Sequence, residues 1–88
     1  MLKVREPQVA GFFYPAEREE LERTVRTFLL AADDEGPAPK ALIVPHAGYA
    51  YSGAIAASGY ALVRGPIRRV VLLGTAHRYS AGRLIVTA

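Results

Sequence analysis

Two histidines, His46 and His77, are the residues of this chain whose type and spacing best suit chemistry. His46 follows a short apolar run, 41–44, by two residues, and His77 follows a second apolar run, 67–73, by four. If both runs are parallel strands, both side chains lie beyond the carboxyl ends of the strands, where open α/β sheets bind their ligands. We therefore expect the two imidazole rings to lie side by side at one edge of a sheet.

The chemistry open to such a pair depends on its companions. Neutral imidazole is the commonest metal ligand in proteins, and two histidines with a carboxylate bind iron(II) in non-haem oxygenases. The sequence offers no clear third ligand nearby, because Tyr49, Tyr51 and Tyr79 belong to a residue type that seldom binds metals. On the residues alone, a metal half-site, a general acid–base pair and a hydrogen-bonded structural pair remain open.

Several other chemistries are excluded by the composition and the motifs. The chain has no cysteine, which rules out disulfides, thiolate metal ligands and a cysteine nucleophile. Ser52 lacks the GxSxG turn that exposes a hydrolase nucleophile. Neither the P-loop pattern nor the dinucleotide-binding glycine pattern occurs. The two histidines are therefore the main candidates for a functional site.

An α/β arrangement is predicted to position the histidines. A helical apolar period predicts a helix over 16–32, and a small-residue stretch predicts a second helix over 53–63. The continuous apolar run 41–44 predicts a strand buried on both faces, the run 67–73, apolar around Arg68 and Arg69, predicts a second strand, and the tail 82–88 has the pattern of a third. Strand, helix and strand with short connections form a right-handed parallel βαβ unit, so the predicted fold class is α/β with flanking helices.

The composition is that of one globular domain over residues 1–88, with 51% hydrophobic and 22% charged residues. The net charge is +3, but the basic residues are scattered apart from Arg64, Arg68 and Arg69, which does not indicate a nucleic-acid binder. No apolar run approaches the ~20 residues that cross a bilayer, and the charged N-terminus is unlike a signal peptide. We expect a cytoplasmic protein with no nucleic-acid or membrane partner.

Three blocks of the sequence resemble the Memo family, which is named for a mediator of cell motility. They are VAGFFYP at 9–15, KALIVPHAGYAYSGAIAASGY at 40–60 and IRRVVLLGTAHR at 67–78. The resemblance implies the N-terminal part of a fold similar to that of class III extradiol dioxygenases. Because members of the family are far longer, the 88 residues are interpreted as a single, incomplete and truncated Memo-like domain.

The resemblance also implies a set of site residues. In the Memo family, the histidines that correspond to His46 and His77 bind a divalent metal, and the family favours iron or copper over zinc. The third ligand would lie outside this chain. The resemblance further implies a pocket for a small molecule or a phosphopeptide, lined by Phe13 and Tyr51. Arg78 is expected to contact an anion there, because guanidinium pairs well with phosphate oxygens.

The function implied by the resemblance is that of a protein similar to AmmeMemoRadiSam system protein B. The enzyme hypothesis is a metal-dependent oxidation by a non-haem oxidoreductase related to extradiol dioxygenases. Two alternatives remain open, namely a non-enzymatic module that binds phosphopeptides or proteins, and an inactive truncated remnant. In each case an unpaired sheet edge would promote association, through that edge or with a chain that supplies the missing part.

Overall fold

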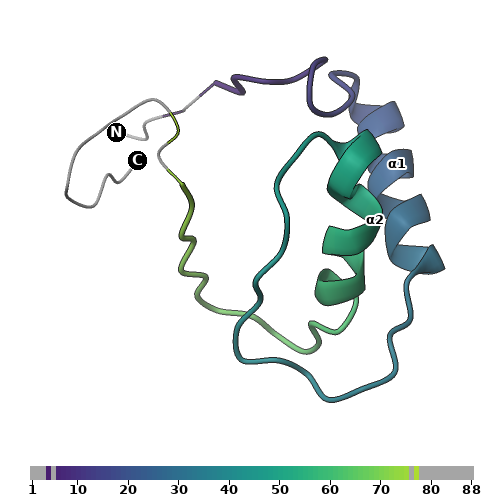
Figure 1. Ribbon diagram of the computed structural model, residues 1–88, viewed down its shortest axis with the longest axis vertical. Helices are drawn as coiled ribbons and strands as arrows, with labels where there is room; N and C mark the ends of the chain where they lie inside the picture. The colour runs from purple at the N-terminus through teal and green to yellow at the C-terminus, as the bar shows by residue number, and fades with distance from the viewer. Residues whose placement is uncertain (1–3, 5, 76, 78–88) are drawn as a thin grey trace.

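The computed structural model describes residues 4, 6–75 and 77, and these residues form two helices joined by long connections (Figure 1). Helix α1 spans Arg18–Ala31 and helix α2 spans Tyr49–Tyr60. Figure 1 shows the two helices next to each other on one side of the molecule, while the connections loop around the other side. The helical pair is the packed part of the described chain.

Helix α1 forms where the apolar period predicts it, one or two residues shorter than the predicted range at each end. Glu17 is the N-cap residue, and Glu19 and Glu20 occupy the first turn, where carboxylates interact favourably with the positive end of the helix dipole. Glu22 and Arg26 form an exposed ion pair of 3.0 Å at the i,i+4 spacing predicted for them.

The predicted bounds of the second helix, 53–63, are wrong. Helix α2 begins four residues earlier, after the N-cap Gly48, because the Tyr51 and Ser52 amides both donate to the Gly48 carbonyl and close a first turn. It ends three residues earlier, since the Leu62 and Val63 amides bond to carbonyls three residues back instead of four. Tyrosines in a first turn cost little helix stability, which explains why their presence does not delay the start.

Glycines in α2 allow close contacts on two sides of the helix. A Cβ at Gly53 would lie 2.6 Å from Cε2 of Phe28, so the absence of a side chain here lets the Phe28 ring of α1 lie directly against α2. A Cβ at Gly59 would lie 3.0 Å from Cγ1 of Val44, which places the segment 41–44 against α2. Helix α2 therefore packs between α1 and the first apolar segment.

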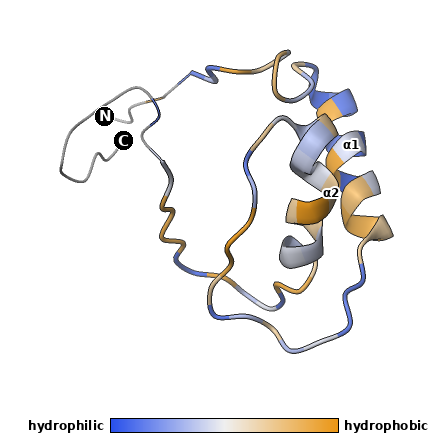
Figure 2. Ribbon diagram, in the orientation of Figure 1, coloured by the Kyte–Doolittle hydropathy of each residue, from blue (hydrophilic) through white to orange (hydrophobic). Residues whose placement is uncertain are grey.

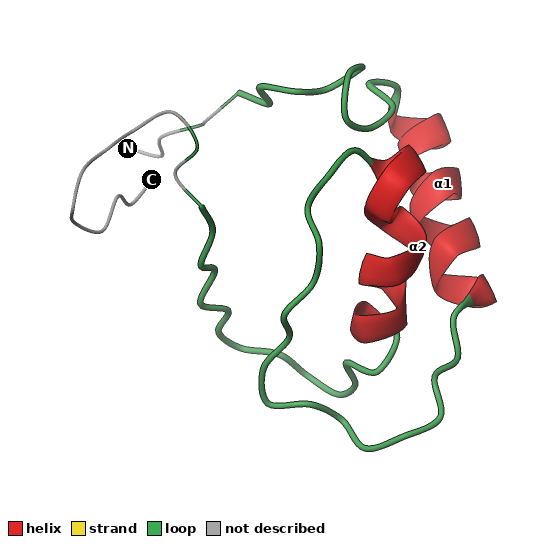
Figure 3. Ribbon diagram, viewed as in Figure 1, coloured by secondary structure: helices red, strands yellow, loops and turns green. Residues whose placement is uncertain are grey.

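The two apolar segments predicted as strands are connections in the described part of the chain (Figure 3). Along 41–44 burial alternates, with Leu42 and Val44 half-buried and Ile43 fully exposed, which is the two-residue period of a strand. The segment 67–73 is exposed throughout, although Figure 2 colours much of it as hydrophobic. We find no hydrogen bond between the two segments among the described residues.

The parallel βαβ unit thus remains a prediction. Figure 1 shows the segments 41–48 and 67–75 running in the same direction, one before α2 and the other after it, as the crossover of a parallel βαβ unit requires. The third predicted strand, 82–88, lies outside the described residues.

Candidate functional site

The two histidines meet directly, although 31 residues separate them in the sequence. Nε2 of His46 lies 3.1 Å from Nε2 of His77, and both side chains are exposed. The ring centroids are 5.2 Å apart and the ring planes are inclined by 45°, so the rings approach each other through their Nε2 ends. The juxtaposition predicted from the sequence is therefore confirmed, while the chemical role of the pair remains a prediction.

The distance between the two nitrogens suits two different states of the pair. In the free chain one ring donates an Nε2–H and the other accepts it, which makes an N–H···N hydrogen bond. An imidazole nitrogen lies about 2.0–2.1 Å from a bound zinc ion, so two such ligands at tetrahedral or octahedral angles lie roughly 2.9–3.4 Å apart. The observed 3.1 Å falls within that range. Both Nε2 atoms could bind one ion once the donating ring moves its proton to Nδ1.

The two histidines supply only part of a coordination sphere. No group of three or more histidine, cysteine, aspartate or glutamate side chains comes together among the residues that the structure describes. Catalytic metal sites commonly have three protein ligands. Within the described chain the pair is therefore a half-site, open to water or to a ligand from elsewhere.

The loop that carries His46 is attached to the first turn of α2. Ser52 is buried, with 8% of its surface exposed, and its hydroxyl donates a hydrogen bond of 3.0 Å to the Ala47 carbonyl. The next carbonyl, that of Gly48, accepts the amides of Tyr51 and Ser52 at 2.9 and 3.1 Å. The residues that follow His46 are consequently tied to a helix, not to another loop.

The N-terminal block 9–15 is attached to the same helical turn. The Tyr49 amide donates to the Phe13 carbonyl at 2.7 Å, and the rings of Tyr14 and Tyr49 lie 5.5 Å apart. Gly11 has a φ of +84°, which allows the tight turn in which its amide bonds to the Tyr14 carbonyl at 2.7 Å. The block therefore lies against the start of α2, close in sequence to His46.

The structure describes two of the three residues predicted to line a pocket, Phe13 and Tyr51. Phe13 holds the start of α2 through its main chain, and its side chain is about half exposed. Tyr51 lies in the first turn of α2 with 88% of its surface exposed. Arg78 lies outside the described residues. The part of the chain that the structure describes therefore places Phe13 and Tyr51 at the same end of α2 as His46.

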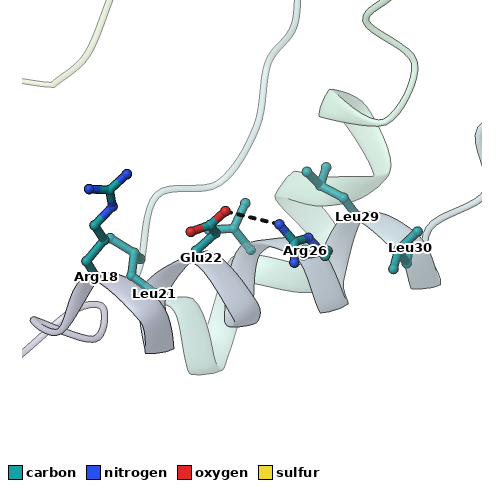
Figure 4. A pocket seen from close by; sticks show the side chains of 7 residues that line it. Arg18, Leu21, Glu22, Arg26, Leu29 and Leu30 are labelled. Carbon is teal, nitrogen blue, oxygen red and sulfur yellow. Dashed lines mark hydrogen bonds and ion pairs between the residues drawn. The ribbon is translucent and has the colours of Figure 1, made fainter.

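A shallow depression lies on α1 and contains none of the predicted site residues (Figure 4). Its lining consists of Arg18, Leu21, Glu22, Val25, Arg26, Leu29 and Leu30. All of these residues come from one helix, and Figure 4 shows the Glu22–Arg26 ion pair among them. The depression is an open helix surface and not an enclosed site.

Sequence reasoning missed the role of Ser52, which it considered only as a nucleophile. A serine in the first turn of a helix can bond through its hydroxyl to a nearby main-chain carbonyl. This tendency could have suggested that the Ser52 hydroxyl bonds to the main chain. The particular acceptor, the Ala47 carbonyl, depends on how the preceding loop turns.

The sequence that carries these features was compared with known protein families. Residues 5–88 match the sequence model of the family described as Memo-like protein. The match covers nearly the whole chain, and the chain therefore belongs to the Memo family.

Individual relatives agree with this assignment. A MEMO1 family protein from Aquifex aeolicus is 46% identical over 76 residues, covering 86% of this chain and 28% of the relative. MEMO1 family proteins from Thermoplasma volcanium and Aeropyrum pernix are 40% and 43% identical, over 28% and 31% of their own lengths. The chain thus spans less than a third of the curated relatives that it matches.

Two further comparisons are negative. No solved protein structure gives a significant match to the chain. Among the described residues, neither helix has the length and apolar character needed to cross a membrane.

Proposed function

We propose that this chain supplies two protein ligands, His46 Nε2 and His77 Nε2, to a divalent metal site of a Memo-family protein. The observation that carries the proposal is the 3.1 Å between the two nitrogens, a spacing that two ligands of one ion require. Chance contact between exposed side chains is a poor explanation, because these are the only two histidines of the chain and 31 residues separate them.

The identity of the metal rests on the family resemblance. Imidazole is a suitable ligand for iron, copper and zinc alike, so the pair by itself does not select among them. We propose iron or copper, with a third ligand outside this chain. A bound metal of this kind would supply redox or Lewis-acid chemistry, and the proposed activity is an oxidation related to that of extradiol dioxygenases.

The surroundings of the pair support a ligand site at the same end of α2. Phe13 and Tyr51 present exposed aromatic surface there, which suits a small aromatic molecule or a phosphopeptide. We propose these two residues as the pocket wall, in a cytoplasmic protein. Activity, substrate and partners belong to the whole protein, of which this chain corresponds to less than a third in the matched relatives.

We further propose that the apolar segments 41–44 and 67–73 form parallel strands when the rest of the sheet is present. The exposed side chains along 67–73 support this, since a strand of that composition is normally covered on both faces. The missing neighbours would come from a longer chain or from a second polypeptide, which makes association through this edge an expected property.

Metal titration of the purified chain tests the proposed function. We expect copper(II) to bind weakly and with a stoichiometry of one in calorimetry, because two imidazoles leave most of the coordination sphere to water. His46→Ala and His77→Ala should each reduce the affinity at least tenfold. Ser58→Ala is the matched control, since its exposed hydroxyl bonds only to the Ile55 carbonyl on α2. Equal binding by all four proteins, or none by a folded wild-type chain, would contradict the proposal.

A further inference from the structure

The direction of the His46 side chain depends on how the main chain that follows it, 47–49, is held. The second peptide group after His46 includes the Ala47 carbonyl, which accepts the Ser52 hydroxyl at 3.0 Å. The third includes the Gly48 carbonyl and the Tyr49 amide, which bond to the first turn of α2 and to the Phe13 carbonyl. These two groups are thus held by hydrogen bonds, and only one of the bonds is made by a side chain.

That side-chain bond joins the loop 45–48 to the helix. Gly48 lies between the Ala47 carbonyl and the first turn of α2, and because it has no Cβ its main chain is restrained less than that of other residues. The Ser52 hydroxyl bonds across Gly48, because its acceptor, the Ala47 carbonyl, lies on the far side of Gly48 from the helix. Ser52 itself is buried and belongs to the part of α2 that packs against the rest of the molecule.

We infer that Ser52 is a positioning residue, whose hydroxyl fixes the loop 45–48 through Ala47 and thereby holds His46 Nε2 within bonding distance of His77 Nε2. Its importance for metal binding rests on the proposed function. Its effect on the contact between the two imidazoles is separate and can be measured without metal.

The first experiment compares Ser52→Ala with Ser58→Ala in the whole 88-residue chain. Both variants remove a serine hydroxyl that bonds to a main-chain carbonyl, and both lie on α2. Nuclear Overhauser contacts between the ring protons of His46 and His77 report the juxtaposition without metal. We expect Ser52→Ala to lose these contacts and to bind copper(II) about five- to tenfold more weakly, while Ser58→Ala matches the wild type.

A second pair of variants separates positioning from folding. Ser52→Thr keeps a hydroxyl, whereas Ser52→Val introduces a side chain of nearly the same shape as threonine but without a hydroxyl. Any cost of the larger side chain is therefore similar in the two variants. We expect the ring contacts to persist in Ser52→Thr and to disappear in Ser52→Val at equal helix content by circular dichroism. This comparison still decides the inference if Ser52→Ala unfolds α2.

The outcomes distinguish the inference from the proposed function. Ring contacts that survive in both Ser52→Ala and Ser52→Val would overturn the role of Ser52, whatever the metal affinity. Ring contacts that depend on Ser52 in a chain that binds no copper(II) would support the positioning role and contradict the metal site.

Discussion

The helical pair and the two apolar segments differ in what each needs from the rest of the molecule. Helices α1 and α2 satisfy their main-chain hydrogen bonds internally and pack together where Gly53 meets Phe28. The segment 67–73 has five apolar residues out of seven but leaves Val71 and Leu72 each 84% exposed. A strand can satisfy its main chain only by pairing with a neighbour, so its structure depends on other parts of the sheet.

This difference indicates where the stability of the chain resides. Among the described residues only Ser52 and Ala57 are buried, and both belong to α2. Small domains bury a low fraction of their surface and are correspondingly marginal. The helical pair therefore contains the best-buried residues of the described chain, whereas the histidines follow the more exposed apolar segments.

The largest expected effect comes from filling the contact between the helices. Gly53→Val should destabilise the chain by roughly 1–3 kcal/mol, because a Cβ at this position would lie 2.6 Å from Cε2 of Phe28 and the ring would have to leave its contact with α2. Urea unfolding followed by circular dichroism measures the change.

Gly74→Val is the control for that experiment, since a Cβ at Gly74 meets nothing within 4 Å. We expect its stability to stay within about 0.5 kcal/mol of the wild type. Similar losses of unfolding free energy in Gly53→Val and Gly74→Val would show that the helical pair and the region after the second apolar segment are equally well packed, which would contradict the difference described above.

A smaller effect is expected at the junction of the two regions. The Arg64 guanidinium donates through Nη2 to the Asp34 carbonyl at 2.8 Å and to the Gly36 carbonyl, which ties the connection after α2 to the connection after α1. Arg64→Ala should lower the free energy of unfolding by about 1 kcal/mol. Thermal unfolding measures it, with Arg69→Ala as a control of equal charge. If Arg64→Ala melted at the wild-type temperature, the hydrogen bonds of Arg64 to the Asp34 and Gly36 carbonyls would contribute nothing to stability.

The smallest effect on stability is expected in the exposed segment itself. Leu72→Lys should change the free energy of unfolding by less than about 0.5 kcal/mol, because the leucine makes few contacts to lose. It should reduce self-association in sedimentation velocity, since charge discourages pairing at a strand edge. Val44→Lys, half-buried against α2, should cost more than 1 kcal/mol. A large loss in Leu72→Lys would mean that the segment is already packed.

The elements that could be predicted from the sequence are those whose signals are local. Helix α1 follows from its apolar period and acidic first turn, and its predicted and observed bounds differ by no more than two residues. The start of α2 depends on the Gly48 carbonyl and on Phe13, which lies in the distant block 9–15. Because the local pattern contains no sign of that contact, it predicted a helix start four residues too late.

The candidate site was predictable for a topological reason. Two histidines that follow apolar segments on either side of a helix are brought to one end if the segments run in the same direction, and His46 and His77 lie 3.1 Å apart. The hydrogen bond from Ser52 to Ala47 could not be predicted, because it depends on the turn of a loop and on burial that only packing defines.

The contact between His46 and His77 closes a ring of main chain around α2, since 31 residues separate the two side chains. Closing a flexible ring of this size removes conformational entropy worth roughly 3–4 kcal/mol at 25 °C by the loop-closure estimate. An ion bound by both imidazoles would act as a non-covalent cross-link of that ring. Its apparent affinity would therefore report how far the ring is already closed, and it would rise wherever a completed sheet holds the two ends together.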